Sequence, residues 1–387
     1  MAIGSQPVLI LGAGINGCAV ARELLLNGVS VWLVDCGDVA SGATAGSSRL
    51  IHGGLRYLEY GEFDLVKESL AERSRLLSLA PQFVQPIRLW IPVASRLGGA
   101  VAAVGRFFSW PWWPQPQPRH GRGVWLIGAG LKFYDAYSRT SQLPAHKVLR
   151  ANAPEAPAVD QSKYRWLCSY YDGQVPYAER LLVALLTDAT EVARETGLEF
   201  RLFTYHQATL QGRSVEIVPT DAASVHGGNN KVEPAAIVNA TGAWVDQTLA
   251  RLDVPSRRLM GGTKGSHLFT FSPTLRAALA GQGIYAEASD GRPIFITPLA
   301  DTILIGTTDE PFEGPPENAL ITTSEIEYLV RAVNMILPGA RLTTADIDFH
   351  YSAVRPLPFV SSASPAAITR RHWLVQHDDG PVPLVSI

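Results

Sequence analysis

The alternation of apolar and polar positions predicts short buried strands separated by amphipathic helices. Val8–Leu11 is an apolar run of strand length, residues 31–34 form another, and the residues at 19–27 between them repeat with a helical period. Two apolar runs joined by a helix are typical of parallel strands with a crossover connection. The chain therefore begins with a predicted β-α-β unit, which places it in the α/β class.

Glycines connect the first predicted strand to its helix. Gly12, Gly14 and Gly17 stand in the spacing Gly-x-Gly-x-x-Gly, with Asn16 in the same turn. The first glycine permits a tight turn, the second lets the backbone approach a pyrophosphate, and the third lets the helix pack closely on the strand. The free N–H groups at the helix start then face the phosphates. This context predicts a dinucleotide site.

The second predicted strand ends at Asp35, whose carboxylate is placed to accept hydrogen bonds from ribose hydroxyls. The turn alone does not separate NAD from FAD, because both carry the same ADP half. Small and hydroxyl residues follow at 37–48, and a later strand at 235–239 ends in Thr241-Gly242. We interpret both segments as lining a longer, flavin-containing cofactor; the alternative for 37–48 is a mobile linker.

Composition limits the remaining possibilities. The 387 residues predict two or three domains, and 47% hydrophobic with 18% charged residues excludes a disordered chain. A net charge of −2 argues against a nucleic-acid partner. The three cysteines have neither zinc-site nor disulfide-framework spacing, so we expect no metal and a reducing, cytoplasmic compartment. No apolar stretch is long enough to span a bilayer, so any membrane attachment is expected to be peripheral.

Motifs along the whole chain resemble the FAD-dependent glycerol-3-phosphate dehydrogenases, a branch of the D-amino-acid-oxidase-like flavoproteins. The most specific is Ser-Ser-Arg-Leu-Ile-His-Gly-Gly-Leu-Arg-Tyr-Leu at 47–58, which separates this family from the amino-acid oxidases. The others lie at residues 10–17, 132–135, 239–245, 264–267, 305–309, 351–357 and 367–370.

The resemblance implies hydride transfer from sn-glycerol 3-phosphate to FAD, which yields dihydroxyacetone phosphate, and electron transfer to a membrane quinone. Two alternatives stay open: an oxygen-using glycerol-phosphate oxidase, and a truncated, non-catalytic FAD-binding paralogue. The residues implied to bind FAD are Gly12, Gly14, Asn16, Gly17, Asp35, Thr44, Ser47, Ser48, Gly53, Gly54, Thr241 and Gly242.

A phosphorylated polyol calls for guanidinium groups, because arginine binds phosphate through two parallel hydrogen bonds and stays charged. Arg56, Arg355 and Arg370 lie in the matching motifs and are predicted to hold the substrate, with Tyr57 beside them and Arg371 as a weaker candidate.

Hydride loss from C2 requires a proton acceptor near the C2 hydroxyl. We predict His267 as this base, with Arg355 and Arg56 completing the catalytic set; a structural role for the histidine is the alternative. His52 is a candidate to hydrogen-bond the flavin or orient Arg56, and Asp309 to stabilise a nearby cation.

The chain departs from the family pattern in two places. After Ile387 the family continues into a Gly-Gly-Lys loop, a helix and a helical domain, so we expect a chain ending there to bind FAD and accept hydride less well unless another polypeptide completes the site. Aromatic residues gather beside arginines at 97–125, which predicts attachment to the inner face of the cell membrane; packing inside the substrate domain or a lid is the alternative.

The order of elements predicts a Rossmann-like FAD-binding domain with an inserted, sheet-containing substrate domain. We expect residues 1–85, 165–257 and 352–387 in the first, with a helix at 178–197 on its sheet, and residues 86–164 and 258–351 in the second. Strands of the second sheet are predicted at 263–271, 294–296 and 302–306, and a homodimer is a further expectation.

Overall fold

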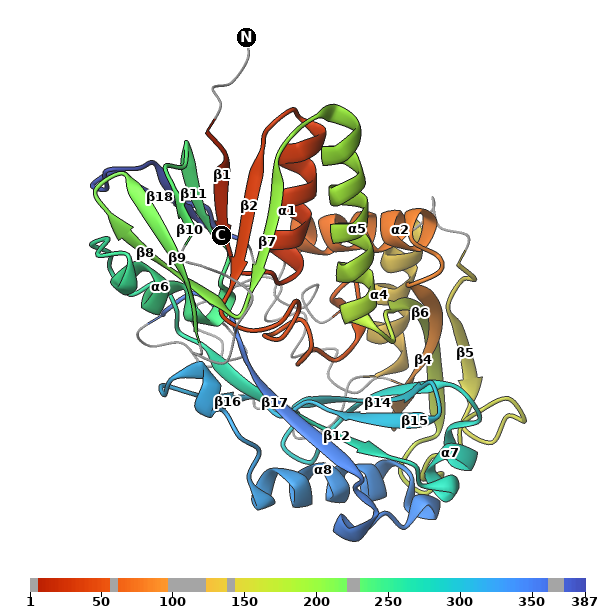
Figure 1. Ribbon diagram of the computed structural model, residues 1–387. Helices are drawn as coiled ribbons and strands as arrows, with labels where there is room; N and C mark the ends of the chain where they lie inside the picture. The colour runs from red at the N-terminus through yellow and green to blue at the C-terminus, as the bar shows by residue number, and fades with distance from the viewer. Residues whose placement is uncertain (1–5, 56–61, 97–122, 138–142, 221–229, 361–371) are drawn as a thin grey trace, which may run out of the picture.

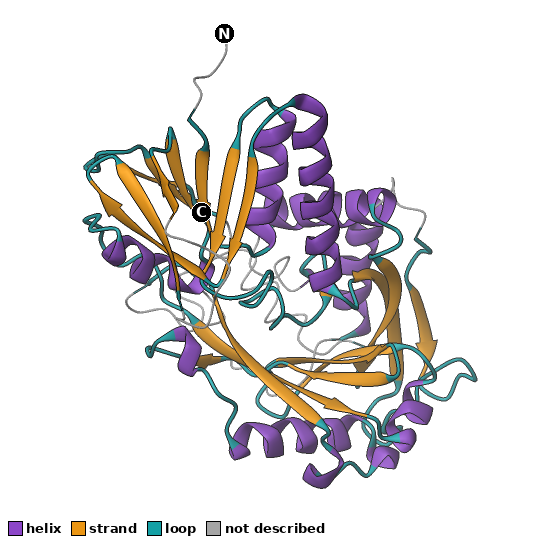
Figure 2. Ribbon diagram, viewed as in Figure 1, coloured by secondary structure: helices purple, strands orange, loops and turns teal. Residues whose placement is uncertain are grey.

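The computed structural model contains two large sheets, on which helices pack, and a small three-stranded sheet (Figure 1, Figure 2). The structure describes residues 6–55, 62–96, 123–137, 143–220, 230–360 and 372–387. Within these ranges no helix combines the length and hydropathy needed to cross a bilayer.

The first sheet has six strands in the order β18-β19-β11-β1-β2-β7 and is parallel except at the β18–β19 pair. Its apolar strands are buried on both faces, as parallel strands require. Ile10 and Leu33 face helices α1 and α5, whereas Leu9 and Trp32 face a three-stranded sheet and α6. The strands of the first sheet are β1 (Val8–Leu11), β2 (Val31–Asp35), β7 (Phe200–Thr204), β11 (Ala236–Asn239), β18 (Val375–His377) and β19 (Leu384–Ser386). The three-stranded sheet consists of β8 (His206–Gln211), β9 (Ser214–Pro219) and β10 (Asn230–Val232). The helices around them are α1 (Ile15–Leu26), α5 (Ala178–Thr196), the short η2 (Gly242–Trp244) and α6 (Val245–Arg251).

The second sheet has ten strands in the order β16-β12-β15-β14-β13-β4-β6-β3, with β17 paired to β12 and β5 to β6. They are β3 (Leu50–Ile51), β4 (Gln85–Val93), β5 (Lys147–Arg150), β6 (Trp166–Gln174), β12 (Thr263–Thr270), β13 (Gly283–Glu287), β14 (Pro293–Leu299), β15 (Thr302–Gly306), β16 (Glu310–Pro311) and β17 (Phe349–Arg355).

Helices pack on the second sheet in two groups. One group comprises α7 (Pro273–Leu279) and α8 (Thr323–Ile336), which share an apolar core with β12, β14 and β15. The other comprises α2 (Phe63–Leu79) and α4 (Val124–Tyr137), which pack with β4 and β6. Figure 1 shows α8 on the side of the sheet away from α1 and α5. Short 3-10 turns lie at Pro316–Asn318, Pro338–Ala340 and Thr344–Asp346.

The α/β class is confirmed, and so are the β-α-β unit, the helix at 178–197 and the second-sheet strands predicted near 263–271, 294–296 and 302–306. The first helix begins at Ile15, earlier than predicted, because the helix includes the glycine turn's last residues. The predicted domain boundaries stay a prediction. Strands β6 and β3, which those boundaries assign to the FAD domain, pair within the second sheet.

Candidate functional site

The glycine turn lies at the carboxyl edge of the parallel sheet and leaves no room for a side chain at Gly12 or Gly17. Gly12 has φ +101°, and a Cβ there would lie 2.6 Å from the Ala240 carbonyl oxygen. A Cβ on Gly17 would lie 1.8 Å from the Gly12 carbonyl oxygen, which confirms the close helix packing inferred for this glycine. At Gly14 a Cβ would meet Thr44 Oγ1 at an ordinary 3.6 Å, so the protein itself does not require glycine there.

Asp35 ends β2 beside this turn. Its Oδ2 accepts the Ala13 N–H at 2.6 Å and its Oδ1 accepts the Gly37 N–H at 2.8 Å. Burial raises the pKa of Asp35, and the two N–H donors oppose that shift. Asn16 is exposed at the start of α1, where the Ile15 N–H donates to Thr44 Oγ1 at 3.2 Å. The helix start, the acid and the 37–48 segment therefore meet at one edge.

The chain returns to this edge after β11. The Ala240 N–H donates to the Leu11 carbonyl at 2.8 Å, and the Thr241 hydroxyl donates to Asn239 Oδ1 at 2.7 Å. Gly242 follows with φ +59°. The predicted Thr241-Gly242 turn thus adjoins the glycine turn, as the sequence indicated.

Residues 47–54 run from the nucleotide edge to the second sheet. The Ser47 carbonyl accepts the Tyr351 hydroxyl, and Ser48 Oγ lies 2.8 Å from His267 Nε2. Further on, His52 is exposed and stacks on a ring of β14, with centroids 6.1 Å apart, while Gly53 and Gly54 are buried. This segment therefore connects the two parts of the candidate site.

Arg355 ends β17 beside Thr263 of β12. Its Nη1 donates to Asp309 Oδ1 at 3.0 Å and to Thr263 Oγ1 at 3.2 Å; its Nη2 donates to Thr307 Oγ1 and the Thr308 carbonyl, both at 2.8 Å. The side chain is 27% exposed. A Cβ at Gly265 would lie 2.2 Å from Nη2, so the guanidinium occupies the space that a side chain at this position would fill. Asp309 is the carboxylate partner of this cation.

His267 pairs with Tyr351, four register positions along β12 and β17 from the Thr263–Arg355 pair, and is 3% exposed. Burial, followed by the positive charges of Arg355 and Arg49, lowers the pKa of His267 to about 3. Its ring packs against Tyr351, with centroids 5.0 Å apart. The imidazole is consequently neutral at physiological pH, and Nδ1 is buried without a hydrogen-bond partner in the described part of the chain.

Alternation along β12 sends Lys264 and Ser266 to the opposite face from Gly265 and His267. Lys264 Nζ and Ser266 Oγ both donate to Glu325, each at 2.7 Å. Burial raises the pKa of Glu325, but the bonds from Lys264 and its other donors prevail and bring it to about 2. This network fixes β12 on α8. Sequence reasoning missed it, although Thr322-x-x-Glu325 is a capping-box pattern that the structure confirms.

Arg49 is another residue that sequence reasoning missed. It is 8% exposed with φ +57°, and it forms a bidentate pair with Glu179 through two bonds of 2.6 Å. Its Nη2 also donates to the Ala45 carbonyl at 2.9 Å. Arg49 therefore ties the 37–48 segment to the start of α5. Sequence reasoning could have found Arg49 from its place in the 47–58 motif.

Some predicted residues lie outside the described part of the chain. These are Arg56, Tyr57, Arg370, Arg371 and most of the aromatic segment at 97–125. The structure therefore places Arg355, His267, Ser48 and Asp309 together and leaves the remaining substrate residues as predictions.

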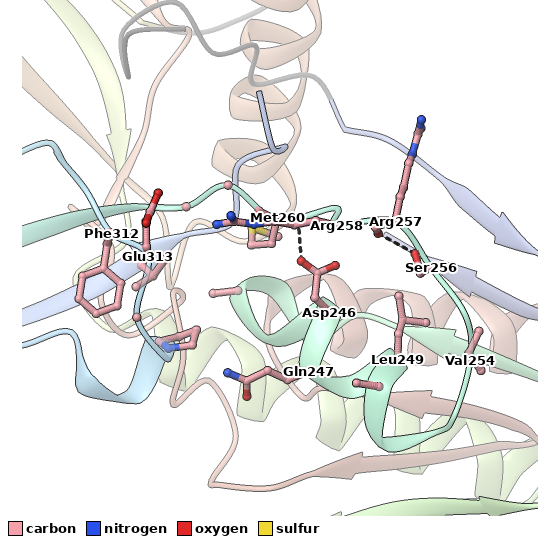
Figure 3. Close-up of a pocket in the computed structure, with 17 residues that line it drawn as sticks. Asp246, Gln247, Leu249, Val254, Ser256, Arg257, Arg258, Met260, Phe312 and Glu313 are labelled. Atoms are coloured by element: carbon pink, nitrogen blue, oxygen red, sulfur yellow. Dashed lines mark hydrogen bonds between the residues drawn. The ribbon is translucent and has the colours of Figure 1, made fainter. Parts of the chain in front are cut away.

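A cavity of about 530 Å³ lies next to the site (Figure 3). It lies between α6 and the loop at 256–262, and Asp246 closes one side by accepting the N–H groups of Leu259 and Met260, each at 2.9 Å. Val354, next to Arg355, also lines it, as does Ala243, next to Gly242. The sequence did not predict this cavity.

The glycine turn, its acid and the returning Thr-Gly loop are the features that a flavin-linked dinucleotide site needs, and the profile of the "FAD dependent oxidoreductase" family matches residues 7–381. The chain belongs to this family. FAD is the family's cofactor, and the chain fits it: the turn would be closed by a Cβ at Gly12 or Gly17, and Asp35 stands beside it.

Similar proteins extend this family assignment. A glycerol-3-phosphate dehydrogenase of Synechocystis is 36% identical over 98% of this chain and 66% of its own length. A D-erythritol 1-phosphate dehydrogenase of Brucella abortus is 32% identical over 98% of this chain and 69% of its own length. The structure of the Bacillus halodurans glycerol-3-phosphate dehydrogenase complexed with FAD has a TM-score of 0.68, at 20% identity over 100% of this chain and 61% of that one. The chain spans about two thirds of the length of these curated relatives.

Proposed function

We propose that this family member oxidises sn-glycerol 3-phosphate to dihydroxyacetone phosphate and passes the electrons through FAD to a quinone. The observation that carries the proposal is that Arg355 and His267 lie on the paired strands β17 and β12, where His267 contacts Ser48 and the charge of Arg355 lowers the His267 pKa. An arginine for phosphate and an imidazole for a hydroxyl proton are the two groups this chemistry requires. The similarity to the Synechocystis enzyme supports the same substrate.

Residues of the glycine turn and of the 44–54 segment would hold the cofactor. We propose that the α1 start with Gly12, Gly14, Asn16 and Gly17 faces the pyrophosphate and that Asp35 faces the ribose. The remaining residues proposed to contact FAD are Thr44, Ser47, Ser48, Gly53, Gly54, Thr241 and Gly242. When bound, FAD supplies the acceptor for the hydride.

Arg355 is proposed to bind the phosphate together with Arg56, Tyr57 and Arg370. Asp309 holds the guanidinium beside Gly265, which orients its donors before substrate arrives. A phosphate dianion would exchange with part of the present hydroxyl and carbonyl contacts. Orientation by a carboxylate lowers the ordering cost of binding.

His267 is proposed to accept the C2 hydroxyl proton. Its low pKa arises from burial and from two neighbouring arginines, so a phosphate dianion bound at Arg355 would offset part of that repulsion and raise the pKa. Ser48 belongs to the segment proposed to face the cofactor, and its hydroxyl, 2.8 Å from Nε2, would accept the substrate proton while donating its own to the ring. Water is excluded from the imidazole ring because the ring is buried between Tyr351 and the backbone at Gly306.

Peripheral attachment to the inner face of the cell membrane is also proposed, because a quinone acceptor is membrane-borne. Aromatic residues and arginines at 97–125 support it. At the described end of this segment Trp125 is 70% exposed. A homodimer remains a further proposal.

The visible spectrum of the purified chain with added FAD tests the reaction. Anaerobic glycerol 3-phosphate is expected to bleach the flavin bands, and erythritol 1-phosphate tests the second substrate class. Bound flavin that no substrate bleaches would contradict the proposed activity and favour a non-catalytic FAD-binding protein. Oxygen consumption equal to dye reduction would favour an oxidase over a quinone-linked enzyme.

A further inference from the structure

A buried polar cluster lies beneath the 52–54 segment and takes no part in the proposed chemistry. Tyr134 of α4, Asp172 of β6 and Arg73 of α2 are 2%, 1% and 1% exposed. The Tyr134 hydroxyl donates to Asp172 Oδ1, and Arg73 Nη1 donates to the same oxygen at 2.8 Å and to the Tyr171 carbonyl at 2.9 Å. The Gly53 N–H donates to the Tyr134 oxygen at 2.8 Å and, at a longer 3.4 Å, to Asp172 Oδ1.

The direction of these bonds is set by charge. Burial, followed by the neighbouring Asp172 carboxylate, raises the pKa of Tyr134 well above its usual value, so the phenol keeps its proton and donates it to Asp172. The phenol oxygen is then left as an acceptor for the Gly53 N–H. A chain of oriented bonds thus runs from Arg73 to the backbone at Gly53.

Stability alone does not explain an ion pair at this place. The cluster is surrounded by apolar side chains, among them Leu70, Leu131 and Val66. Burying two charges costs several kcal/mol for each, and apolar residues of similar volume often stabilise a core as well or better. What an apolar core cannot do is fix one backbone N–H in space, and that is what the Tyr134 oxygen does.

The segment above the cluster is held from several directions. A Cβ at Gly53 would lie 2.3 Å from Leu70 Cδ2 and 2.7 Å from the Tyr134 oxygen, so the backbone rests directly on both. The next N–H, of Gly54, donates to His52 Nδ1 at 3.1 Å. Both glycine N–H groups therefore donate to acceptors within the protein.

We propose that Tyr134, Asp172 and Arg73 are positioning residues that hold residues 52–54 against the isoalloxazine ring of FAD. The inference rests on the proposed function, because it takes the segment to face the flavin. It also gives a role to the 132–135 motif, which the substrate and cofactor assignments left unused.

Tyr134→Phe removes the nearer acceptor of the Gly53 N–H and leaves only the 3.4 Å contact to Asp172 Oδ1, and Tyr170→Phe is the matched control. Tyr170 is 3% exposed and meets the Tyr134 ring edge-on at 5.7 Å, but no hydrogen bond joins it to the described residues of the 52–54 segment. We expect hydrogen–deuterium exchange in a peptide covering 50–55 to rise about tenfold in Tyr134→Phe. The FAD dissociation constant, from quenching of flavin fluorescence, is expected to rise roughly five- to tenfold. Tyr170→Phe should stay within twofold in both measurements.

Equal effects of the two variants, whether both small or both large, would overturn the proposal, because packing rather than the Gly53 bond would then explain them. Asp172→Asn serves if Tyr134→Phe does not fold. Its amide oxygen still accepts the tyrosine proton, so the exchange at 50–55 is expected to rise at least threefold above that of Tyr170→Phe through the weakened chain of bonds. No difference from Tyr170→Phe would again overturn the proposal.

The two proposals fail in distinguishable ways. Wild-type protein that binds FAD but is not bleached by glycerol 3-phosphate contradicts the reaction and leaves the positioning of 52–54 to be judged by exchange and FAD affinity. Bleaching in wild type with unchanged exchange and affinity in Tyr134→Phe contradicts only the positioning role.

Discussion

Replacing Arg355 by alanine tests the substrate site most directly. The change removes a guanidinium whose η nitrogens donate four hydrogen bonds to described residues, one of them to the Asp309 carboxylate. If the same donors bind the substrate phosphate, a charge-assisted bond of about 1.5–3 kcal/mol is lost from the transition state. That corresponds to a fall in kcat/KM of roughly 10- to 150-fold.

The assay is steady-state reduction of an artificial dye with glycerol 3-phosphate as substrate. Added guanidinium ion is expected to restore part of the lost rate, because Gly265 leaves an open surface where the side chain lay. Arg331→Ala is the control, since Arg331 forms a surface pair with Glu327 at 3.2 Å and is 67% exposed. A kcat/KM for Arg355→Ala within twofold of wild type would refute the reasoning, as would an equal loss in the control.

Two further outcomes follow from the structure, and a third follows from the sequence. Lys264→Met leaves the Glu325 carboxylate buried and unpaired, so we expect a loss of about 3–5 kcal/mol in the free energy of unfolding, measured with urea; a loss below 1 kcal/mol would contradict it. His267 has a folded pKa of about 3 against an ordinary 6.5, so the unfolded state binds the extra proton and stability should fall as pH drops from 6.5 toward 3. His267→Gln should flatten that part of the curve, and an unchanged slope would count against the buried neutral imidazole. Deleting residues 105–114 should release the protein from anionic liposomes in sedimentation assays; equal sedimentation with and without them would exclude that anchor.

Local features of the nucleotide edge were predictable from sequence. The positive φ of Gly12 and the close approach of Gly17 to the Gly12 carbonyl are local features, whereas the approach of Gly12 to Ala240 is a long-range contact. The strand and helix periods likewise depend on neighbouring residues, which is why β1, β2 and α5 were predicted in place.

The sequence by itself determined the α/β order, the glycine turn with its acid and the motifs that indicate the family. Only the tertiary structure decided how charges and donors are shared at the site. His267 meets Ser48 across 219 positions of sequence, and Gly53 meets Tyr134 across 81. The low pKa of His267 depends on burial, and so does the strength of the pairing of Arg355 with Asp309; both also depend on charges that folding brings close together. The spacing of residues along the chain gives neither the burial of a group nor its distance from other charges.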